Sequence, residues 1–130
     1  MKIAVVSHIA LDTIQDMKGR ITESLGGPAC YCSITARKFN FKVNLATKVG
    51  RDFSQDNRLM LRTNGIDIDD TLFTDSPTTR FRIIQRKDGR ELFLLSKCSP
   101  ITIDFYQAQF TPTDTNITAA FVLVLKQVTP

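Results

Sequence analysis

The sequence has no tryptophan, only three cysteines and no long apolar run. Its longest apolar runs, residues 3–6 and 119–125, are far shorter than the roughly 20 residues that a membrane helix requires. The amino terminus shows no apolar signal region that ends in a small-residue cleavage site. These absences predict a cytoplasmic protein with no membrane partner.

The cysteines are also too few and too scattered for a structural role. An odd number provides no disulfide framework and agrees with a reducing compartment. Cys30 and Cys32 fall in a predicted helix, where residues two apart point to different sides. Only His8 and Cys98 could join them as soft ligands. The sequence therefore predicts no structural metal site.

Length and composition indicate one folded domain. Of the 130 residues, 42% are apolar and 23% are charged, which argues against a disordered chain or a fibre. A chain of this size can bury roughly two thirds of its unfolded surface, so it can form a core. It is too short for one domain that binds substrate and another that binds a cofactor.

The net charge of +4 comes from one segment. Outside residues 80–97 the basic and acidic residues are equal in number. A nucleic-acid surface needs cations spread along a face, so this distribution disfavours one. The segment's basic residues are Arg80, Arg82, Arg86, Lys87, Arg90 and Lys97, against Asp88 and Glu91.

Apolar runs and alternation predict the extended segments. Residues 3–6 form the continuous apolar run of a strand buried on both faces. Residues 13–25 are mostly polar and alternating, which predicts a half-exposed hairpin. Residues 41–49 alternate and predict a second strand, and residues 66–73 a third extended piece.

Glycine and proline mark the start of the first helix. Gly26 and Gly27 free the backbone for positive φ, and Pro28 suits the first turn of a helix that continues to about Phe39.

A second helix is predicted after Asp52. Asp52 has Gln55 three residues later, as an N-cap with a capping-box partner would. Asn64 and Gly65 are a helix-end signal. Beyond Pro100 the pattern is weaker and predicts a short helix within residues 101–110, a loop over 111–118 and a buried strand over 119–125.

The basic segment is a predicted hairpin. Residues 78–85 and 90–95 flank an Asp-Gly pair, which favours a tight turn. Strand parity places Arg80, Arg82 and Arg86 on one face and Phe81 and Ile83 on the other. Such an arginine row is commonly a solvated strand face.

Several short motifs occur in an order that resembles the amino-terminal half of the ribokinase-like (PfkB) family of carbohydrate and nucleoside kinases. The resemblance covers roughly residues 1–100 and depends on the ordered set, since each motif alone is weak. The motifs are Ser-His-Ile-Ala-Leu-Asp12, Gly26-Gly27-Pro28-Ala29, Thr47-Lys-Val-Gly-Arg-Asp52, Asn64-Gly-Ile-Asp67 and Thr78-Thr79-Arg80-Phe81.

The resemblance implies an α/β fold, a partial Rossmann-like αβα sheet with a small β-sheet lid. Residues 1–130 would be the amino-terminal part of the kinase domain, with lid strands near 13–24 and 78–95. The family's Gly-Ala-Gly-Asp-type loop, which carries the catalytic base and anion hole, does not occur in these residues. ATP and Mg²⁺ are implied for the complete enzyme, and neither is expected to bind tightly to this chain alone.

The resemblance also assigns site residues, all of them substrate-binding, with no catalytic residue and no metal ligand. Asp12 would bind substrate hydroxyls, and Gly26 and Gly27 would form a hinge that approaches the substrate. Arg80 would touch the substrate or its phosphate, because a guanidinium matches phosphate oxygens. Without the family, Asp12 would be taken for a turn residue.

Departures from the family leave the substrate open. Ser7 stands where glycine is common, and no asparagine follows the glycine pair closely. Gln55 replaces the last glycine of a Gly-x-Asp-x-x-Gly motif. His8 follows a strand as a general base could, but a lone histidine is more often a satisfied buried side chain.

Two functions follow as expectations. The first is the substrate-binding and lid portion of an ATP-dependent sugar or nucleoside kinase, truncated and inactive alone, with a possible homodimer through the lid. The alternative is a non-enzymatic module whose basic hairpin binds an anionic partner. Nucleic acid is the disfavoured partner, because no aromatic stacking residues share the face of the arginines.

Overall fold

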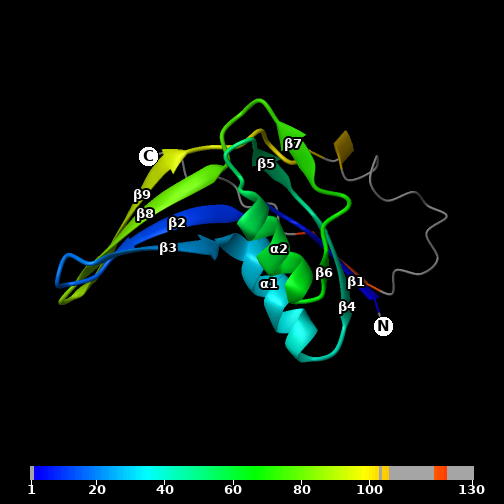
Figure 1. Cartoon of the computed structure of the whole chain (residues 1–130), viewed down its shortest axis with the longest axis horizontal. Coiled ribbons are helices and arrows are strands. Elements are labelled where there is room, and N and C mark those ends of the chain that lie inside the picture. The colour runs from blue at the N-terminus through cyan, green and yellow to red at the C-terminus, as the bar shows by residue number, and fades with distance from the viewer. Residues whose placement is uncertain (1, 103, 106–118, 123–130) are drawn as a thin grey trace.

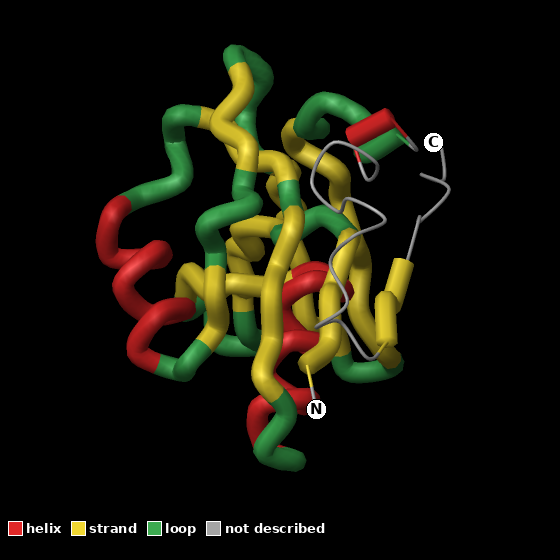
Figure 2. The backbone as a smooth tube through the Cα atoms, turned by 90° about the vertical axis from the view of Figure 1, so that its right-hand side faces the viewer, coloured by secondary structure: helices red, strands yellow, loops and turns green. Residues whose placement is uncertain are grey.

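A parallel sheet forms the body of the molecule (Figure 1). The computed structural model describes residues 2–102, 104–105 and 119–122. Within them the strand order is β10-β1-β4-β6 and every pair is parallel. Figure 2 shows β10 at the edge far from α2. The strands are β1 (Lys2–Val6), β4 (Lys42–Ala46), β6 (Ile66–Asp67) and β10 (Ala119–Val122). The predicted α/β class is confirmed.

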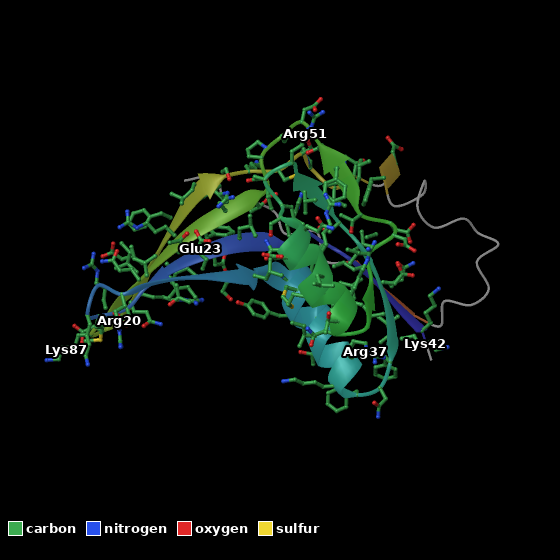
Figure 3. The ribbon with its side chains drawn as sticks, viewed as in Figure 1. Arg20, Glu23, Arg37, Lys42, Arg51 and Lys87 are labelled. Atoms are coloured by element: carbon green, nitrogen blue, oxygen red, sulfur yellow. The ribbon has the colours of Figure 1, made fainter. Side chains whose placement is uncertain are left out.

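A second sheet extends away from the helices, and we call it the projecting sheet (Figure 1). Its order is β3-β2-β8-β9, with β2 and β8 parallel and the other pairs antiparallel. Arg20, Glu23 and Lys87 lie on it in Figure 3. Both predicted hairpins are confirmed here. The strands are β2 (Ala10–Gln15), β3 (Ile21–Gly26), β8 (Thr79–Arg86) and β9 (Gly89–Ser96).

The expected strands over residues 41–49 and 66–73 are each divided between two sheets. β5 (Lys48–Gly50) and β7 (Leu72–Thr74) leave the body and pair with each other. The break lies at Thr47, which is 1% exposed. Its hydroxyl accepts a bond from the Ile9 N–H, and its carbonyl accepts one from Leu72. Alternation continues across the break, so the sequence pattern did not reveal it.

The two labelled helices cover one face of the body. Helix α1 (Gly27–Lys38) buries Ala29, Cys30 and Ser33, and these small residues let it approach the sheet closely. Helix α2 (Gln55–Thr63) ends at Asn64, followed by Gly65 at φ 76°, as predicted. Neither helix is long and apolar enough to cross a membrane, nor is any other in the described part of the chain.

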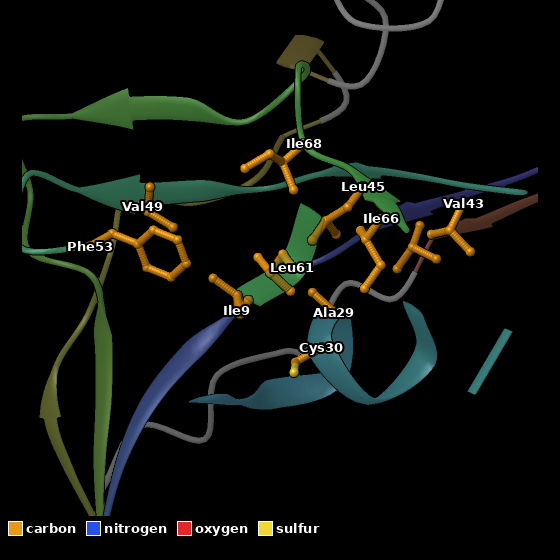
Figure 4. Packing of buried hydrophobic residues seen from close by; sticks show 11 residues of the cluster. Ile9, Ala29, Cys30, Val43, Leu45, Val49, Phe53, Leu61, Ile66 and Ile68 are labelled. Carbon is orange, nitrogen blue, oxygen red and sulfur yellow. The ribbon is translucent and has the colours of Figure 1, made fainter. Parts of the chain in front are cut away.

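The core lies between these helices and the strands (Figure 4). Ile9, Leu45 and Leu61 are at most 1% exposed, and burying each stabilises the fold by roughly 1.5–3 kcal/mol. The other face of the sheet has a smaller cluster in which Ala4, Val6 and Ala46 meet Phe105.

The segment after Pro100 is described only in part. Residues 104–105 are helical, and β10 lies within the strand expected over 119–125. The rest of the predicted helix and the loop over 111–118 lie outside the described residues.

Candidate functional site

Asp12 lies inside β2, so it is not the turn residue for which it would be taken without the family. Its carboxylate packs directly against Gly26, at the junction of β3 and α1. The residue is 6% exposed, and its Oδ1 atom is buried with no hydrogen-bond partner among the residues that the structure describes. An unpartnered buried acceptor costs about 1–3 kcal/mol. A carboxylate kept at this cost is suited to accept a hydrogen bond from a ligand.

Burial also sets the electrostatics around Asp12. Burial raises the pKa of its carboxyl, and the positive charge of Arg90 partly opposes this. Burial, and then the charge of Asp12, raise the pKa of the Cys30 thiol. Arg90 pairs with Gln85 across β8 and β9, which places it on the same face as Asp12. Sequence analysis did not single out Arg90, although strand parity from Phe81 would have placed it there.

Gly26 and Gly27 are needed for different reasons. Gly26 has an ordinary φ of −143°, so the expected positive φ is wrong there; a side chain would collide with the carboxylate of Asp12. Gly27 has φ 82°, and a Cβ would lie 2.9 Å from the His8 oxygen. Helix α1 starts here without a side-chain cap or an acidic first turn. Its positive end therefore suits an oxygen ligand.

Arg80 is not brought together with these three residues. Arg80 pairs with Leu11, and Phe81 with Asp12, in the register of β2 and β8. Because side chains alternate, Arg80 and Asp12 leave the sheet on opposite faces. The Arg80 Nε atom instead lies 3.0 Å from an Asp52 oxygen.

A pocket of about 450 Å³ lies on the Arg80 face, between the projecting sheet and α2. Its two walls combine apolar and polar side chains. Asp12 and Ser24 also border this pocket, but it is the side chains of the residues before and after each of them that point into it. Because side chains alternate along a strand, the Asp12 carboxylate points to the opposite face of the projecting sheet. The lining residues are Leu11, Asp12, Thr13, Glu23, Ser24, Leu25, Asp52, Ser54, Asn57, Met60 and Arg80.

Asp52 ties the loop before α2 to the start of β8. Its Oδ1 accepts hydrogen bonds from the Thr78 N–H at 2.9 Å and the Thr78 hydroxyl at 2.6 Å. Burial raises its pKa, but the bonds from Thr78 and Arg80 outweigh burial and hold the pKa below 3.8. The predicted N-cap role of Asp52 is wrong. Ser54 caps α2 by accepting a bond from Asn57, and the sequence contained this signal.

His8 has a structural environment. Its Nε2 lies 2.8 Å from the carbonyl oxygen of Ser99, to which the neutral ring can donate. Burial lowers the pKa of the imidazole, and although the Ser99 bond opposes this, Lys48 and Lys97 lower it further. His8 is therefore a neutral, satisfied side chain, as the sequence favoured.

Metal ligands and a nucleotide cradle were not predicted for this chain. In the ranges that the structure describes, no group of three or more His, Cys, Asp or Glu could hold a metal ion. We therefore assign no metal ligand among the described residues.

Comparisons with known proteins identify the fold. A cytidine kinase of Thermococcus kodakarensis is 28% identical over 89 residues, which are 68% of this chain and 32% of that protein. A pyrophosphate-dependent kinase in the ribokinase family, solved as a sulfate complex, is 26% identical with a TM-score of 0.66 over 80% of this chain and 36% of its own. The chain is similar to part of a ribokinase-family kinase.

The ribokinase-like fold recurs at lower identity. A sugar kinase of Pyrococcus horikoshii in complex with ATP is 18% identical, with a TM-score of 0.69 over 79% of this chain and 37% of its own. No family model matches the chain. The matched part thus spans about a third of the length of each of these three kinases.

Proposed function

We propose that this chain forms the acceptor-binding portion of a sugar or nucleoside kinase. Asp12 binds acceptor hydroxyls, and the junction of Gly26 and Gly27 approaches the same group. The observation that carries the proposal is the buried Asp12 carboxylate, whose Oδ1 has no partner although it lies beside an uncapped helix start. A carboxylate can accept hydrogen bonds from two neighbouring hydroxyls.

The projecting sheet acts as the lid in this proposal. Its Asp12 face carries Ile14, Phe81 and Ile83, apolar side chains that would exclude water from a bound acceptor. The proposal also includes a contact of Arg80 with the substrate or its phosphate, for which the bond between Arg80 and Asp52 would have to open or be shared.

The phosphoryl donor belongs to the part of the kinase that these residues do not span. ATP with Mg²⁺ is the proposed donor, and pyrophosphate is the alternative, since relatives of both descriptions match the chain. When bound, the donor supplies the phosphoryl group. This chain's own residues hold and orient the acceptor, so we expect no phosphoryl transfer by the 130 residues alone.

The proposal also includes a homodimer and a cellular location. A homodimer would form through the projecting sheet, whose edge strand β9 exposes Leu92 and Phe93 by 54% and 45%. A cytoplasmic location is proposed from the sequence and is checked by cell fractionation.

The structure favours the kinase over the anion-binding module. Arg80 pairs with Asp52, and Arg86 with Glu91 at 3.2 Å. Arg82 donates to the Gln15 side chain at 3.0 Å. All three arginines therefore have partners within the chain, which reduces what they offer an external anion.

Calorimetric titration with cytidine, ribose and myo-inositol tests the acceptor site. We expect one of these three ligands to bind. Asp12→Asn should weaken its affinity about 10- to 100-fold, because a hydrogen bond to a charged group is lost. Glu23→Gln is the matched control, because Glu23 lies on the other face of the same sheet. If only Glu23→Gln weakened binding, the acceptor site would lie in the Arg80 pocket.

Phosphoryl transfer from ATP or pyrophosphate by the pure chain would contradict the proposal that these residues bind the acceptor but not the donor.

A further inference from the structure

The pocket of about 450 Å³ between the projecting sheet and α2 is separate from the acceptor site proposed at Asp12. It lies on the opposite face of the sheet from the Asp12 carboxylate. Figure 1 shows α2 beside the end of the projecting sheet that joins the body. One wall comes from β2, β3 and β8, and the other from α2 and the loop before it. Pockets that bind small molecules commonly enclose about 300–1,000 Å³, so the size suits a ligand.

The floor of the pocket is apolar. Leu11 and Leu25 are direct partners in the register of β2 and β3, so their side chains lie together on this face. Met60 lines the pocket from α2. All three side chains are partly buried and pack against the core, which holds them in place before a ligand arrives. The floor can therefore bury the apolar body of a ligand.

The charges of the pocket do not balance. Arg80 and Asp52 both line it, but they pair with each other at 3.0 Å. Glu23 lines the pocket as well, and among the described residues it forms no salt bridge. Arg82 lies on the same face two strands away, and its guanidinium donates to the Gln15 side chain. One carboxylate is therefore left to meet a ligand.

The spacing of these groups defines the shape of that ligand. Glu23 and Leu25 are two residues apart on β3, so their side chains leave the same face roughly 6.5 Å apart. Across the pocket, Asn57 donates its backbone N–H to the Ser54 hydroxyl, and in the part of the chain that the structure describes its side-chain amide has no partner. A cationic nitrogen two carbons away from an apolar ring spans the distance from the floor to Glu23.

We propose that this pocket binds a small organic cation, a primary amine carried on an apolar body, at a site separate from the acceptor site. The apolar body lies on Leu11, Leu25 and Met60. The ammonium group donates charge-assisted hydrogen bonds to the Glu23 carboxylate. An anionic ligand fits less well, because Arg80 already has a partner and Glu23 would repel a second negative charge.

Three probes that share an aromatic ring and differ in charge test the chemistry of the pocket. They are 2-phenylethylamine, 2-phenylethanol and 3-phenylpropionate, titrated into the 130-residue chain while backbone amide NMR shifts are followed. We expect the amine to bind with a Kd on the order of 1 mM, as for other ligands of this size, and at least about fivefold more tightly than the other two. The shifts should gather on β2, β3 and the start of α2. Equal binding of the three probes, stronger binding of the anion, or no binding would overturn the proposal.

Variants on both walls locate the contact. Glu23→Gln should reduce the affinity for the amine to that for the alcohol, and Asn57→Lys should weaken the amine about fivefold by placing a cation on the opposite wall. Glu91→Gln is the matched control, because Glu91 leaves the same face of the projecting sheet but lies outside the pocket. An equal loss in Glu91→Gln would mean that the amine responds only to overall charge, which contradicts the proposal.

Competition separates this site from the acceptor site. Cytidine, ribose and myo-inositol should leave the bound amine in place, because Asp12 lies on the other face of the sheet. Displacement of the amine by any of them would make the pocket the acceptor site and overturn the proposal of a second one. Failure of all three to bind anywhere would contradict the proposed function and leave the titration of the amine unaffected, so the two proposals can fail separately.

Discussion

The contact between Asp12 and Gly26 explains why position 26 is a glycine. Gly26 has an unstrained φ, so the backbone alone does not require glycine there. Asp12 occupies the space that a side chain at position 26 would need. From the resemblance, Asp12 was predicted to bind substrate hydroxyls and Gly26 to form part of a hinge, with no contact predicted between them. Their contact depends on the register in which β2 pairs with β3, which the hairpin pattern alone does not fix.

Gly26→Ala should lower the free energy of unfolding by about 1–3 kcal/mol, because the new methyl group overlaps a buried carboxylate. The same substitution in an Asp12→Ala background should cost less than about 0.5 kcal/mol. Urea denaturation of the four proteins measures the coupling. Equal costs in the two backgrounds would mean that the contact is absent.

At the level of elements, the entry into α2 shows how tertiary contacts choose between caps. Asp52 and Ser54 are both common N-cap residues, and only two positions separate them. Thr78, 26 residues away, binds the Asp52 carboxylate through two hydrogen bonds and leaves Ser54 to cap the helix. Sequence spacing gives the helix but does not say which oxygen caps it.

Removing the Asp52 carboxylate should loosen the link between α2 and β8. We expect Asp52→Ala to cost about 1–3 kcal/mol at pH 7, since the buried N–H of Thr78 loses its acceptor. Asp75→Ala is the control, because its pair with Arg51 is exposed by 95% and 85% and should matter little. Denaturation by urea measures both.

The same variant has a defined pH dependence. The Asp52 pKa is lowered in the folded state, so its contribution is present above the unfolded value of 3.8 and is lost as pH falls through the folded pKa. The stability difference between wild type and Asp52→Ala should therefore shrink below about pH 4. If the stability difference stayed constant down to pH 2, the ionised Asp52 carboxylate would not be its source.

Viewed as a whole, the molecule exposes a run of apolar side chains along one edge of the projecting sheet. Strand β9 is an edge strand with four consecutive exposed apolar residues, whereas most edges carry charge or proline. These residues are Leu92, Phe93, Leu94 and Leu95, at 54%, 45%, 37% and 56% exposure. Such an edge favours pairing with a second copy.

Leu92→Glu with Leu94→Glu should convert a dimer into a monomer, because charge on the edge strand opposes burial against another sheet. Sedimentation velocity at increasing concentration measures the change. Leu59→Glu, a similarly exposed leucine on α2, should leave the dimer intact. A monomeric wild-type chain over the same range would contradict assembly through the projecting sheet.

The sequence by itself determined the α/β class, both hairpins, the carboxyl end of α2 and the likeness to ribokinase-like kinases. These follow from apolar periodicity, glycine, proline and motif order, which act over a few residues. Only the tertiary structure decided that Asp12 and Arg80 face opposite sides, that Asp52 accepts hydrogen bonds from Thr78 and that two predicted strands are each divided between two sheets. Each of these depends on which distant segment offers a hydrogen-bond partner or a strand edge, and local periodicity carries no information about that choice.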